Sequence, residues 1–540
     1  MMKQLKSTLD AIIISDIGKD SFSGSNPLKL KIQNKIADIQ VIKNYLDNKG
    51  QILFPIKDDG LFSWNETPRL NGIYLYSFLS SNKINVELIN SYDQQKQRFL
   101  DLLKNNPKCI IISTTFIINK NELKKLVDDI RSVAHDILII AGGPLIYKSY
   151  CLLELSKQSN YEIEHAKKDY LFLNVQDEPQ IDLYITSPKG EDILYNVITR
   201  FINGQNYNDL PDLAWLSDDR FVFTKHQKNT LNKKIHNIDW SIMPDKLFNK
   251  GIISMQASKG CIYNCAFCNF CQNKRLIRIK PIKQIFKEIH DVVNRGIKYI
   301  WFVDDTFRAG KNDLNAFCKM LIKEKLSVKW MSFNRADSLK QVDFDLLKEA
   351  GCIELQIGIE SGDKQILKNM NKQVTPEDYY KIISNLLKTG INCSCYFIIG
   401  FPGETEASVE KTLHFIENIH NNNNEGTLSW SIYPFLLSPL SPIFSNEMRK
   451  QYNLTGYMGN WKHRTMNSNQ AKQLIKEMFL KIEDSGPIYR GDNLNLLSDL
   501  PAIHRKKFMI NRHRLNKKCI NQEPGYEEVK YFFKKILITK

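Results

Sequence analysis

Along the first 235 residues, short apolar runs bounded by polar turns alternate with stretches whose apolar residues recur at helical spacing. The apolar runs predict strands at residues 11–15, 86–89, 109–113 and 137–141. The helical spacing predicts helices at residues 70–81 and 122–133. A strand that is buried on both faces reads as a continuous apolar segment, and such strands alternating with amphipathic helices predict a parallel, doubly wound (Rossmann-like) α/β sheet. Its default ligand crevice lies outside the carboxyl ends of the strands.

A second, more regular pattern begins near residue 251, after a helix at 192–203, a hairpin at 210–224 and a connector at 236–249. Strands are predicted at 252–256, 299–304, 328–334, 353–359, 393–399 and 428–433, and helices at 282–295, 313–325, 344–350, 376–389 and 404–419. Six strands with five helices between them predict a partial (β/α)6 barrel, whose active site would lie at the carboxyl ends of the strands. We therefore expect a Rossmann-like domain at 1–235, a partial TIM barrel at 236–445 and a basic helical and loop region at 446–540.

The composition is that of a folded protein with several domains. Of the 540 residues, 42% are hydrophobic and 25% are charged, which excludes disordered and low-complexity classes. No apolar run approaches the roughly 18 to 20 residues that span a bilayer. The first residues lack the small-residue cleavage site of a secretory signal peptide. We expect a soluble, cytoplasmic protein without a membrane span.

The net charge is positive and unevenly distributed. It is +16 in total, and residues 446–540 carry 19 Lys and Arg against 9 Asp and Glu. A net positive charge favours a negatively charged partner. However, no nucleic-acid-binding motif accompanies the basic segment 505–518. We therefore do not expect a nucleic-acid partner. The positive charge could belong simply to a solvated face. The tail 446–540 as a whole is interpreted as a cover over the barrel mouth or as an appendage that packs on the barrel.

Three of the eleven cysteines, Cys261, Cys265 and Cys268, lie in the loop after the first barrel strand. An odd number of cysteines without a secretory signal indicates reduced thiols. Three soft thiolates on one loop can converge on a metal centre. A structural zinc site needs four ligands, typically from two separated pairs, and no second pair lies at the usual spacing. A [4Fe–4S] cluster with one iron left without a protein ligand fits three cysteines better.

Other interpretations of the cysteines stay open. Cys268 and Cys271 form a C-x-x-C pair, which is also typical of zinc sites and redox dithiols, and the grouping could be a coincidence of packing. The remaining barrel cysteines are interpreted as small buried apolar residues. This group comprises Cys271, Cys318, Cys352, Cys393 and Cys395.

Polar and glycine residues follow the barrel strands at positions where an active site would lie. These segments are Ser258-Lys259-Gly260, Asp304-Asp305, Asn334-Arg335, Gly358-Ile359-Glu360-Ser361-Gly362 and Gly400-Phe401-Pro402-Gly403-Glu404. Together with the C-x3-C-x2-C spacing and Phe267 before the last cysteine, they resemble the radical S-adenosylmethionine (SAM) superfamily. The resemblance covers residues 251 to about 444. It implies that Cys261, Cys265 and Cys268 hold a [4Fe–4S] cluster, whose open iron binds SAM for reductive cleavage to a 5′-deoxyadenosyl radical.

The resemblance also implies which residues bind SAM. Asp304 and Asp305 would accept hydrogen bonds from its ammonium group, and Arg335 would pair with its carboxylate. The same residues also have structural interpretations, since aspartates cap turns and an arginine can serve in an ion pair of the fold.

Two further strand ends complete the implied SAM site. Glu360 or Ser361 would bind the ribose hydroxyls, and the backbone of residues 398–400, with Ile398 and Gly400, would lie along the adenine. Phe267 on the cysteine loop is the remaining residue of the implied set. The glycines of these segments could instead serve only to form turns.

The first region resembles the cobalamin-binding domain that precedes many radical SAM barrels. The similar segments are Asn65–Gly72, Ala141–Pro144, Gly190–Asp192 and Leu210–Ala214. The resemblance implies a corrinoid in contact with Thr114, Gly142, Gly143, Pro144, Gly190 and Glu191. The Asp-x-His-x-x-Gly box that donates an axial histidine to cobalt in other cobalamin proteins is absent, so no cobalt ligand is assigned. A domain that binds substrate without cobalamin is the alternative.

The leading hypothesis is a cobalamin-dependent radical SAM enzyme that methylates an unactivated carbon of a secondary metabolite or peptide. An unactivated carbon has no lone pair to attack SAM, which makes a radical route reasonable. The alternatives are a radical SAM oxidoreductase, cyclase or epimerase without cobalamin, and a non-catalytic iron–sulfur adaptor. A methylthiotransferase is disfavoured because only Cys109 and Cys151 precede residue 261. The expected partners are a small-molecule or peptide substrate and an electron donor such as a flavodoxin or ferredoxin.

Overall fold

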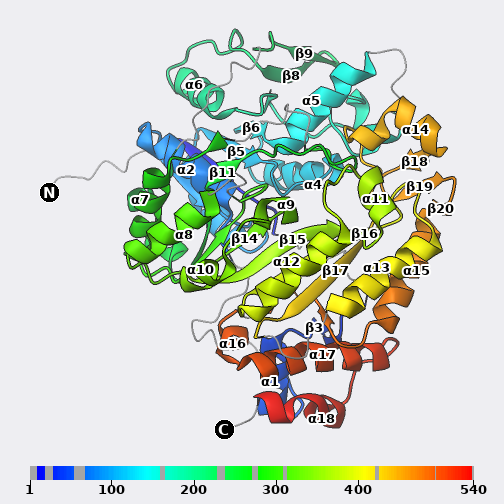
Figure 1. The fold of residues 1–540 in the computed structure, drawn as a ribbon. Helices are drawn as coiled ribbons and strands as arrows, with labels where there is room; N and C mark the ends of the chain where they lie inside the picture. Colours follow the sequence, from blue (N-terminus) through cyan, green and yellow to red (C-terminus); the bar gives the residue numbers. More distant parts are fainter. Residues whose placement is uncertain are drawn as a thin grey trace. The chain divides into compact units, whose positions relative to one another are not determined.

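The structure of the protein is a computed structural model (Figure 1). It describes residues 9–18, 28–53, 67–157, 164–227, 237–270, 278–307, 313–419, 425–489, 491–492 and 494–537. The contacts within the chain define two compact units: unit 1 comprises residues 1–21 and 68–244, and unit 2 comprises residues 22–67 and 245–540. A segment near the N-terminus thus belongs to the second unit, an interleaving that the predicted domain boundary at residue 235 does not include.

Unit 1 is built on a sheet that has seven strands within the described residues, in the order β4–β1–β5–β6–β7–β8–β9. The strands are β1 (Ala11–Ile14), β4 (Val86–Ile89), β5 (Cys109–Ser113), β6 (Leu138–Gly142), β7 (Leu183–Ile185), β8 (Leu213–Ser217) and β9 (Arg220–Phe223). The first five are parallel, and β8 and β9 form the predicted antiparallel hairpin. In chain order the parallel strands run 2-1-3-4-5, the flavodoxin-like doubly wound arrangement. The α/β fold class predicted for this region is confirmed.

The position of the crevice in unit 1 follows from this strand order. The chain leaves β1 toward β4 on one side and places β5 on the other, so the topological switch point lies between β1 and β5. Both strands are buried along their whole length, as their isoleucine-rich sequences predict. The helices of this unit are α2 (Leu70–Ser81), α3 (Lys96–Leu103), α4 (Lys120–Arg131), α5 (Pro144–Ser156) and α6 (Glu191–Ile202).

Unit 2 contains a second seven-stranded sheet within the described residues, in the order β10–β13–β14–β15–β16–β17–β21. Its strands are β10 (Ile252–Met255), β13 (Tyr299–Phe302), β14 (Lys329–Asn334), β15 (Cys352–Glu360), β16 (Asn392–Ile399), β17 (Leu428–Pro434) and β21 (Gly486–Pro487). All neighbouring pairs are parallel. The six predicted strands are present in sequential order, and no pairing closes the sheet among the described residues. The seventh strand is only two residues long and carries no periodicity that could have predicted it.

Five of the helices that follow the strands of unit 2 agree closely with the predicted ranges, and two short ones, at residues 336–339 and 364–369, were not predicted. They are α7 (Ile282–Val293), α8 (Asp313–Lys323), α9 (Ala336–Leu339), α10 (Phe344–Glu349), α11 (Lys364–Asn369), α12 (Pro376–Lys388) and α13 (Glu406–Ile419). α12 shows why the boundaries were predictable: Thr375 and Asp378 form a capping box, and Pro376 occupies the first turn. α12 and α13 lie along the strands β15 to β17 (Figure 1).

The region after residue 445 is more ordered than the predicted mixture of helix and loop. It contains α14 (Asn446–Tyr452), β18 (Thr455–Tyr457), β19 (Asn460–His463), β20 (Met466–Asn467), α15 (Ser468–Lys481), α16 (Leu494–Asp499), α17 (Ala502–Lys518) and α18 (Tyr526–Leu537). β18, β19 and β20 form a small antiparallel sheet that the sequence did not indicate, because its strands are too short to show alternation.

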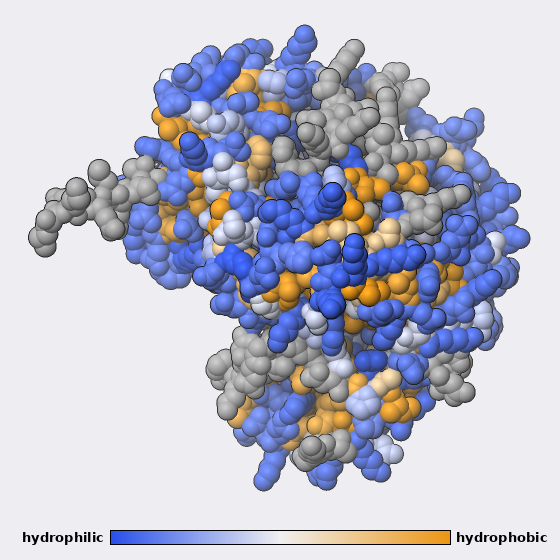
Figure 2. Space-filling view, turned by 60° about the vertical axis from the view of Figure 1, so that its left-hand side comes forward, coloured by the Kyte–Doolittle hydropathy of each residue, from blue (hydrophilic) through white to orange (hydrophobic). Residues whose placement is uncertain are grey.

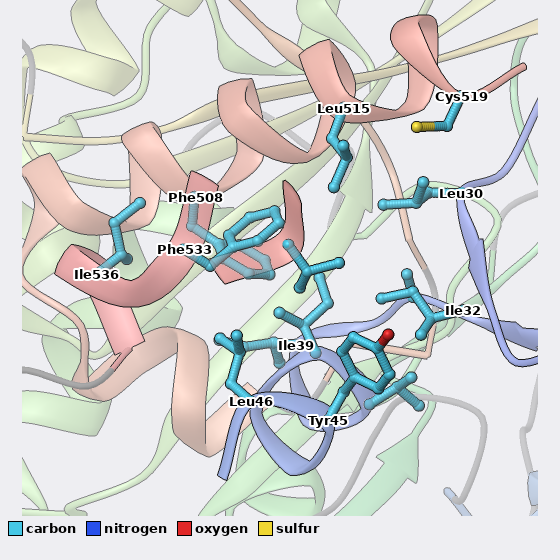
Figure 3. Close-up of a cluster of buried hydrophobic side chains, with 14 residues drawn as sticks. Leu30, Ile32, Ile39, Tyr45, Leu46, Phe508, Leu515, Cys519, Phe533 and Ile536 are labelled. Atoms are coloured by element: carbon cyan, nitrogen blue, oxygen red, sulfur yellow. The ribbon is translucent and has the colours of Figure 1, made fainter. Parts of the chain in front are cut away.

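A separate apolar core joins residues 28–53 to the C-terminal helices. The N-terminal part contributes β2 (Lys31–Ile32), β3 (Lys35–Ile36) and α1 (Ile39–Asp47). Ile39, Tyr45 and Leu46 point toward Phe508 and Phe533 from α17 and α18 (Figure 3). Burial of these side chains from opposite ends of the chain explains why residues 22–67 belong to unit 2.

The basic segment 505–518 forms most of α17, and one of its charges, that of Arg512, is internal. Arg512 is buried and donates to both carboxylate oxygens of Asp492, at 2.5 and 2.8 Å. Arg505 donates to the backbone carbonyl of Glu425, which precedes the amino end of β17. α17 therefore packs on the barrel at the end opposite the carboxyl ends of the strands, so this helix is a packing appendage and does not cover the mouth.

The described surface is largely polar. Hydrophilic residues cover most of the face that Figure 2 shows, and hydrophobic residues form separate patches between them. Within the described ranges, none of the helices combines the length and apolar character needed to cross a membrane.

Candidate functional site

The cysteine loop of unit 2 is fixed at both ends. β11 (Ser258–Lys259) precedes it and pairs with β12 (Arg278–Ile279), and Gly260 has a φ of +102°, a left-handed conformation that favours glycine. The amide of Ala266 donates to the carbonyl of Met370 at 2.9 Å, and the carbonyl of Ala266 accepts from Ile443 at 2.9 Å. The loop is thus held by the segments that follow β15 and β17, at the carboxyl end of the barrel.

The three cysteines lie together on this loop with different exposure. Cys265 is buried, whereas Cys261 and Cys268 are partly exposed, as is Phe267. Among the described residues, no three His, Cys, Asp or Glu side chains are close enough to hold a single metal ion. In a cubane cluster each cysteine binds a separate iron, so its thiolates need not converge on one point. The assignment of these cysteines as cluster ligands stays a prediction.

Of the five other barrel cysteines, four lie within the described residues and one does not. Cys318, Cys352, Cys393 and Cys395 are buried, which confirms their interpretation as small apolar residues. Cys271 lies outside the described residues, so the alternative of a Cys268–Cys271 pair stays untested.

Arg335, at the end of β14, is the charged side chain that contacts the cysteine loop. Its Nη1 donates to Sγ of Cys265 at 3.0 Å, its Nη2 pairs with Asp337 at 3.0 Å, and its guanidinium lies 3.7 Å from the ring centre of Tyr263. Nε of Arg335 and Oδ1 of Asp337 are buried and have no hydrogen-bond partner in the described part of the chain. Burial raises the pKa of the Cys265 thiol, and the positive charge of Arg335 opposes that rise.

The two aspartates after β13 shape the approach to the cysteine loop. The buried carboxylate of Asp304 accepts hydrogen bonds from the Ala257 amide at 3.2 Å and from the amide and hydroxyl of Ser258. Burial raises the pKa of Asp304 to about 7, against the effect of these donors. Asp305 is exposed and accepts from the Gly260 amide at 2.7 Å. Both residues therefore hold the turn before the cysteines, and a contact of either with SAM stays a prediction.

Glu360 ends β15 in an unusual conformation. Its φ is +73°, and the register of β15 with β16 shifts between Gly358 and Glu360. Its carboxylate pairs with the buried ammonium of Lys372 at 2.8 Å. Ser361 is completely buried and its hydroxyl lies 3.3 Å from that of Thr412. The structure thus engages Ser361 within the fold and pairs Glu360 with Lys372, and a contact of either residue with ribose hydroxyls stays a prediction.

Gly400 ends β16 in a turn that is held from several sides. Its φ is +98°, its amide donates to Glu404, and its carbonyl lies 3.2 Å from Nε2 of His463. A Cβ at this position would lie 2.4 Å from the Trp461 ring. Ile398 is partly exposed. Glu404 and His463 thus occupy the polar backbone atoms of Gly400, and a contact of Ile398 or Gly400 with an adenine stays a prediction.

In unit 1, the residues predicted to contact a corrinoid lie at two strand ends. Thr114 follows β5, and its hydroxyl donates to the Gly142 carbonyl at 2.9 Å and accepts from the Leu145 amide at 3.2 Å. Gly143, between β6 and Pro144, has a φ of +109° and would place a Cβ 3.0 Å from the Thr114 hydroxyl. The β5 and β6 ends therefore form one continuous turn, which only glycine at 143 permits.

Gly190 and Glu191 belong to a separate strand end. They follow β7 at the N-terminus of α6, where a Cβ on Gly190 would lie 2.7 Å from Ile185 Cγ2. The glycine is therefore required by helix–strand packing. A corrinoid contact by either residue stays a prediction.

The residues predicted to contact a corrinoid do not include the polar side chains near the switch point, although Arg69 and Asn71 lie within the segment 65–72 that resembles the cobalamin-binding domain. Asn71 donates to the Ser15 carbonyl at 2.9 Å and to the Ser113 hydroxyl at 2.8 Å, and Arg69 pairs with Asp16 at 2.8 Å. Four buried polar atoms near these strand ends have no partner among the described residues: Ser15 Oγ, Thr67 Oγ1, Asn71 Oδ1 and Ser91 Oγ. Their position directly after β1 and β4, or at the start of α2, is the signal that could have identified them.

The comparison with known protein families agrees with this geometry. Residues 255–416 match the Radical SAM superfamily, which confirms the resemblance predicted from the cysteine spacing. The matched residues run from the end of β10 into α13 and include the cysteine loop and the strand ends of unit 2 described above.

Individual relatives are similar over parts of the chain. An uncharacterized methyltransferase of Pyrococcus horikoshii is 30% identical over 167 residues, which are 31% of this chain and 36% of that protein. The chain spans between 36% and 56% of the length of several curated relatives that it matches.

Two solved structures share the fold. One is the radical SAM methyltransferase TsrM from Kitasatospora setae with cobalamin and a [4Fe–4S] cluster bound, with a TM-score of 0.55 and 14% identity over 82% of this chain and 78% of that one. The other is the cobalamin-dependent SAM radical enzyme OxsB with aqua-cobalamin bound, with a TM-score of 0.58 and 15% identity over 98% of this chain and 84% of that one.

Proposed function

We propose that this protein is a cobalamin-dependent radical SAM enzyme that methylates an unactivated carbon of a secondary metabolite or peptide. The observation that carries the proposal is the cysteine loop at the carboxyl end of β10, with the Arg335 guanidinium 3.0 Å from the sulfur of Cys265. A cationic donor beside a thiol favours its thiolate form, which is the form that binds iron.

The residues around this loop fit a [4Fe–4S] cluster and SAM. Cys261, Cys265 and Cys268 supply three thiolates, and the partnerless Nε of Arg335 can bind an anionic group such as a carboxylate. Glu360 offers a carboxylate to hydroxyl groups. When bound, the cluster and SAM supply one-electron chemistry at a carbon, and cobalamin supplies a methyl group. The chain itself binds and orients these groups and excludes water from them.

The switch point of unit 1 fits a large ligand with many polar groups. The partnerless hydroxyls of Ser15 and Ser91 and the amide oxygen of Asn71 are buried at the carboxyl edge of the sheet, where doubly wound folds bind their ligands. Buried polar atoms need partners, and a corrinoid carries amide side chains that would supply them. TsrM and OxsB, which share the fold, were solved with cobalamin bound.

The partners belong to the same proposal. We infer a small-molecule or peptide substrate, and an electron donor such as a flavodoxin or ferredoxin, because reductive cleavage of SAM consumes one electron. Copurification of a corrinoid together with methyl transfer from labelled SAM to the product separates this proposal from cobalamin-free oxidoreductase, cyclase or epimerase chemistry.

The test is anaerobic purification followed by iron, sulfide and corrinoid assays on one sample, with SAM cleavage measured after reduction by dithionite. We expect about four irons per chain, one corrinoid, and transfer of the labelled SAM methyl group to a product. The Cys265→Ala variant should lose the cluster and SAM cleavage, whereas the matched Cys318→Ala variant, which removes a buried thiol elsewhere in the barrel, should keep both. Cluster and SAM cleavage that persist in Cys265→Ala would refute the proposal, and cleavage without corrinoid would support the cobalamin-free alternative.

A further inference from the structure

The turn formed by Met370, Asn371 and Lys372, after α11, contacts two parts of the site at once. On one side it holds the cysteine loop: the Met370 carbonyl accepts from the Ala266 amide at 2.9 Å, and the Asn371 side chain donates to the Asn264 carbonyl at 2.7 Å. Asn371 has a φ of +58°, a left-handed conformation that asparagine tolerates better than most residues. The turn is therefore specifically shaped to meet the loop.

On the other side, Lys372 reaches the end of β15. Its ammonium donates to Glu360 at 2.8 Å, to the Gly358 carbonyl, and to the Tyr379 hydroxyl at 3.3 Å. An ammonium has three donors, so these three acceptors satisfy it completely. The side chain of Lys372 is only 2% exposed, and a buried charge of this kind is held in one place by its partners.

Glu360 depends on this arrangement more than an ordinary strand residue would. Its φ of +73° is strained for a residue with a Cβ, and strained residues persist where their surroundings hold them. A Cβ at Gly358 would lie 2.4 Å from the Glu360 carboxylate, so the glycine makes room for that carboxylate to meet Lys372. The hydrogen bond from Lys372, the positive φ of Glu360 and the absence of a Cβ at Gly358 thus all serve to orient the Glu360 carboxylate.

We propose that Lys372 is a positioning residue, which fixes the Glu360 carboxylate relative to the cysteine loop and couples the order of that loop to the ligand-binding end of β15. The inference rests on the proposed function only for the identity of the ligand, which would be SAM. Lys372 itself does not need to touch the ligand, because its three donors are already used within the fold.

The first experiment needs no cofactor and therefore stands apart from the proposed function. Hydrogen exchange is measured on the full-length apoprotein for wild type, Lys372→Met and Tyr379→Phe. Lys372→Met should speed exchange about tenfold or more both in residues 261–270 and in residues 358–362, with no change in the core strand β13. Tyr379→Phe keeps the ring and removes one of the three acceptors, so its effect should be much smaller. Faster exchange in residues 358–362 alone would overturn the coupling.

The second experiment uses the protein loaded with its iron–sulfur cluster and measures SAM affinity by equilibrium dialysis. Lys372→Met and Glu360→Gln should each weaken binding about tenfold, and the double variant should be little weaker than either one, because residues that act as a unit are non-additive. Iron content should be unchanged in all three variants. A loss of SAM affinity in the double variant that equals the product of the two single losses would overturn the inference. A loaded wild type that binds no SAM would refute the proposed function, while the exchange experiment would still decide the role of Lys372.

Discussion

At the scale of single residues, Arg335 carries the most interactions of the predicted site residues. One guanidinium meets a cysteine sulfur, a carboxylate and an aromatic ring, because its planar fork offers five donors in fixed directions. The resemblance implies a SAM carboxylate as its partner, and the structure adds Cys265. The two roles are compatible because Nε has no partner among the described residues.

We predict that Arg335→Gln lowers the reduction potential of the bound cluster by about 60 mV, the one-electron equivalent of a tenfold change in equilibrium constant. A cationic hydrogen-bond donor at a cluster sulfur stabilises the more negative, reduced state, and glutamine removes the charge. Spectroelectrochemical titration measures the potential. Arg464→Gln, at an exposed arginine of unit 2, is the control and should leave it unchanged. An unaltered potential in Arg335→Gln would show that the sulfur contact is absent from the loaded protein.

At the scale of elements, the turn after β16 shows how a late segment completes an earlier strand end. The Gly400 amide bonds to Glu404 in the following turn, whereas its carbonyl is met by His463 on β19. Burial lowers the pKa of His463, so the ring stays neutral at physiological pH. Trp461 packs on the remaining side of Gly400. The small antiparallel sheet β18–β20 is therefore part of the support for the predicted adenine-binding strand.

We predict that Gly400→Ala costs about 3 kcal/mol of unfolding free energy, because it adds both a strained φ and a steric overlap with Trp461. Gly296→Ala is the matched control: Gly296 has a φ of +88° but no atom within 4 Å of an added Cβ, so only the dihedral cost of about 1 kcal/mol applies. Urea denaturation of both variants gives the comparison. Equal losses would mean that the Trp461 contact adds nothing.

The N-cap of α1 gives a prediction with a defined pH range. Asp38 accepts from the Val41 amide, and burial raises its pKa from 3.8 to about 7, with Asp492 adding to the rise and Arg512 opposing it. Between pH values of about 4 and 7, Asp38 keeps a proton in the folded state that it has released in the unfolded chain. The stability that this bound proton gives to the folded state is therefore lost as pH rises from about 4 to about 7.

Hydrogen exchange in α1 should therefore report lower local stability at pH 7.5 than at pH 5, by about 1–2 kcal/mol after allowance for the partial exposure of the carboxyl group. Asp38→Asn should remove this difference and keep the cap, since asparagine also caps helices well. Asp47→Asn, at an exposed carboxylate that pairs with Lys43 on the same helix, serves as the control and should keep it. A pH dependence that persists in Asp38→Asn would assign it to another group.

At the scale of the whole molecule, the chain is interleaved. The described residues 28–53 pack with the C-terminal helices of unit 2, although residues 68–244 of unit 1 lie between them in the sequence. The apolar core of α1 with α17 and α18 (Figure 3) and the buried pair of Arg512 with Asp492 connect the two distant segments. Asp492 also accepts from the Ile39 amide at 3.0 Å, so the ion pair is linked directly to the N-terminal segment.

We predict that a shortened chain beginning at Asp245 aggregates, because it exposes Phe508, Val529 and Phe533, and each fully buried apolar side chain contributes about 1.5–3 kcal/mol. A synthetic peptide of residues 28–53 added in trans should restore solubility. A peptide in which Ile39 and Leu46 are replaced by serine is the control and should not. The measurement is light scattering with and without each peptide. A shortened chain that stays monomeric without any peptide would show that this core is dispensable.

Much of the fold was predictable because the local periodicity of apolar residues indicates its strands and helices. Six strands of the unit 2 sheet and five of the helices between them have apolar patterns long enough to be predicted directly, whereas α9, α11 and the two-residue strands β11 and β12 do not. The cysteine spacing identifies the loop that lies at the barrel mouth. The cysteine loop and the strand ends Asp304, Arg335, Glu360 and Gly400 could be predicted together, since parallel strands bring their carboxyl ends to one edge.

The sequence by itself therefore determined the order of strands and helices, the α/β class and the residues that line the strand ends, since each depends on neighbours within a few positions. Only the tertiary structure decided that residues 28–53 join the C-terminal helices, that Lys372 holds Glu360, and that Trp461 and His463 support Gly400. These contacts join residues between 12 and 488 positions apart in the chain, and no local pattern encodes which distant partner a buried side chain will meet. Packing and charge pairing select that partner only when the chain is folded.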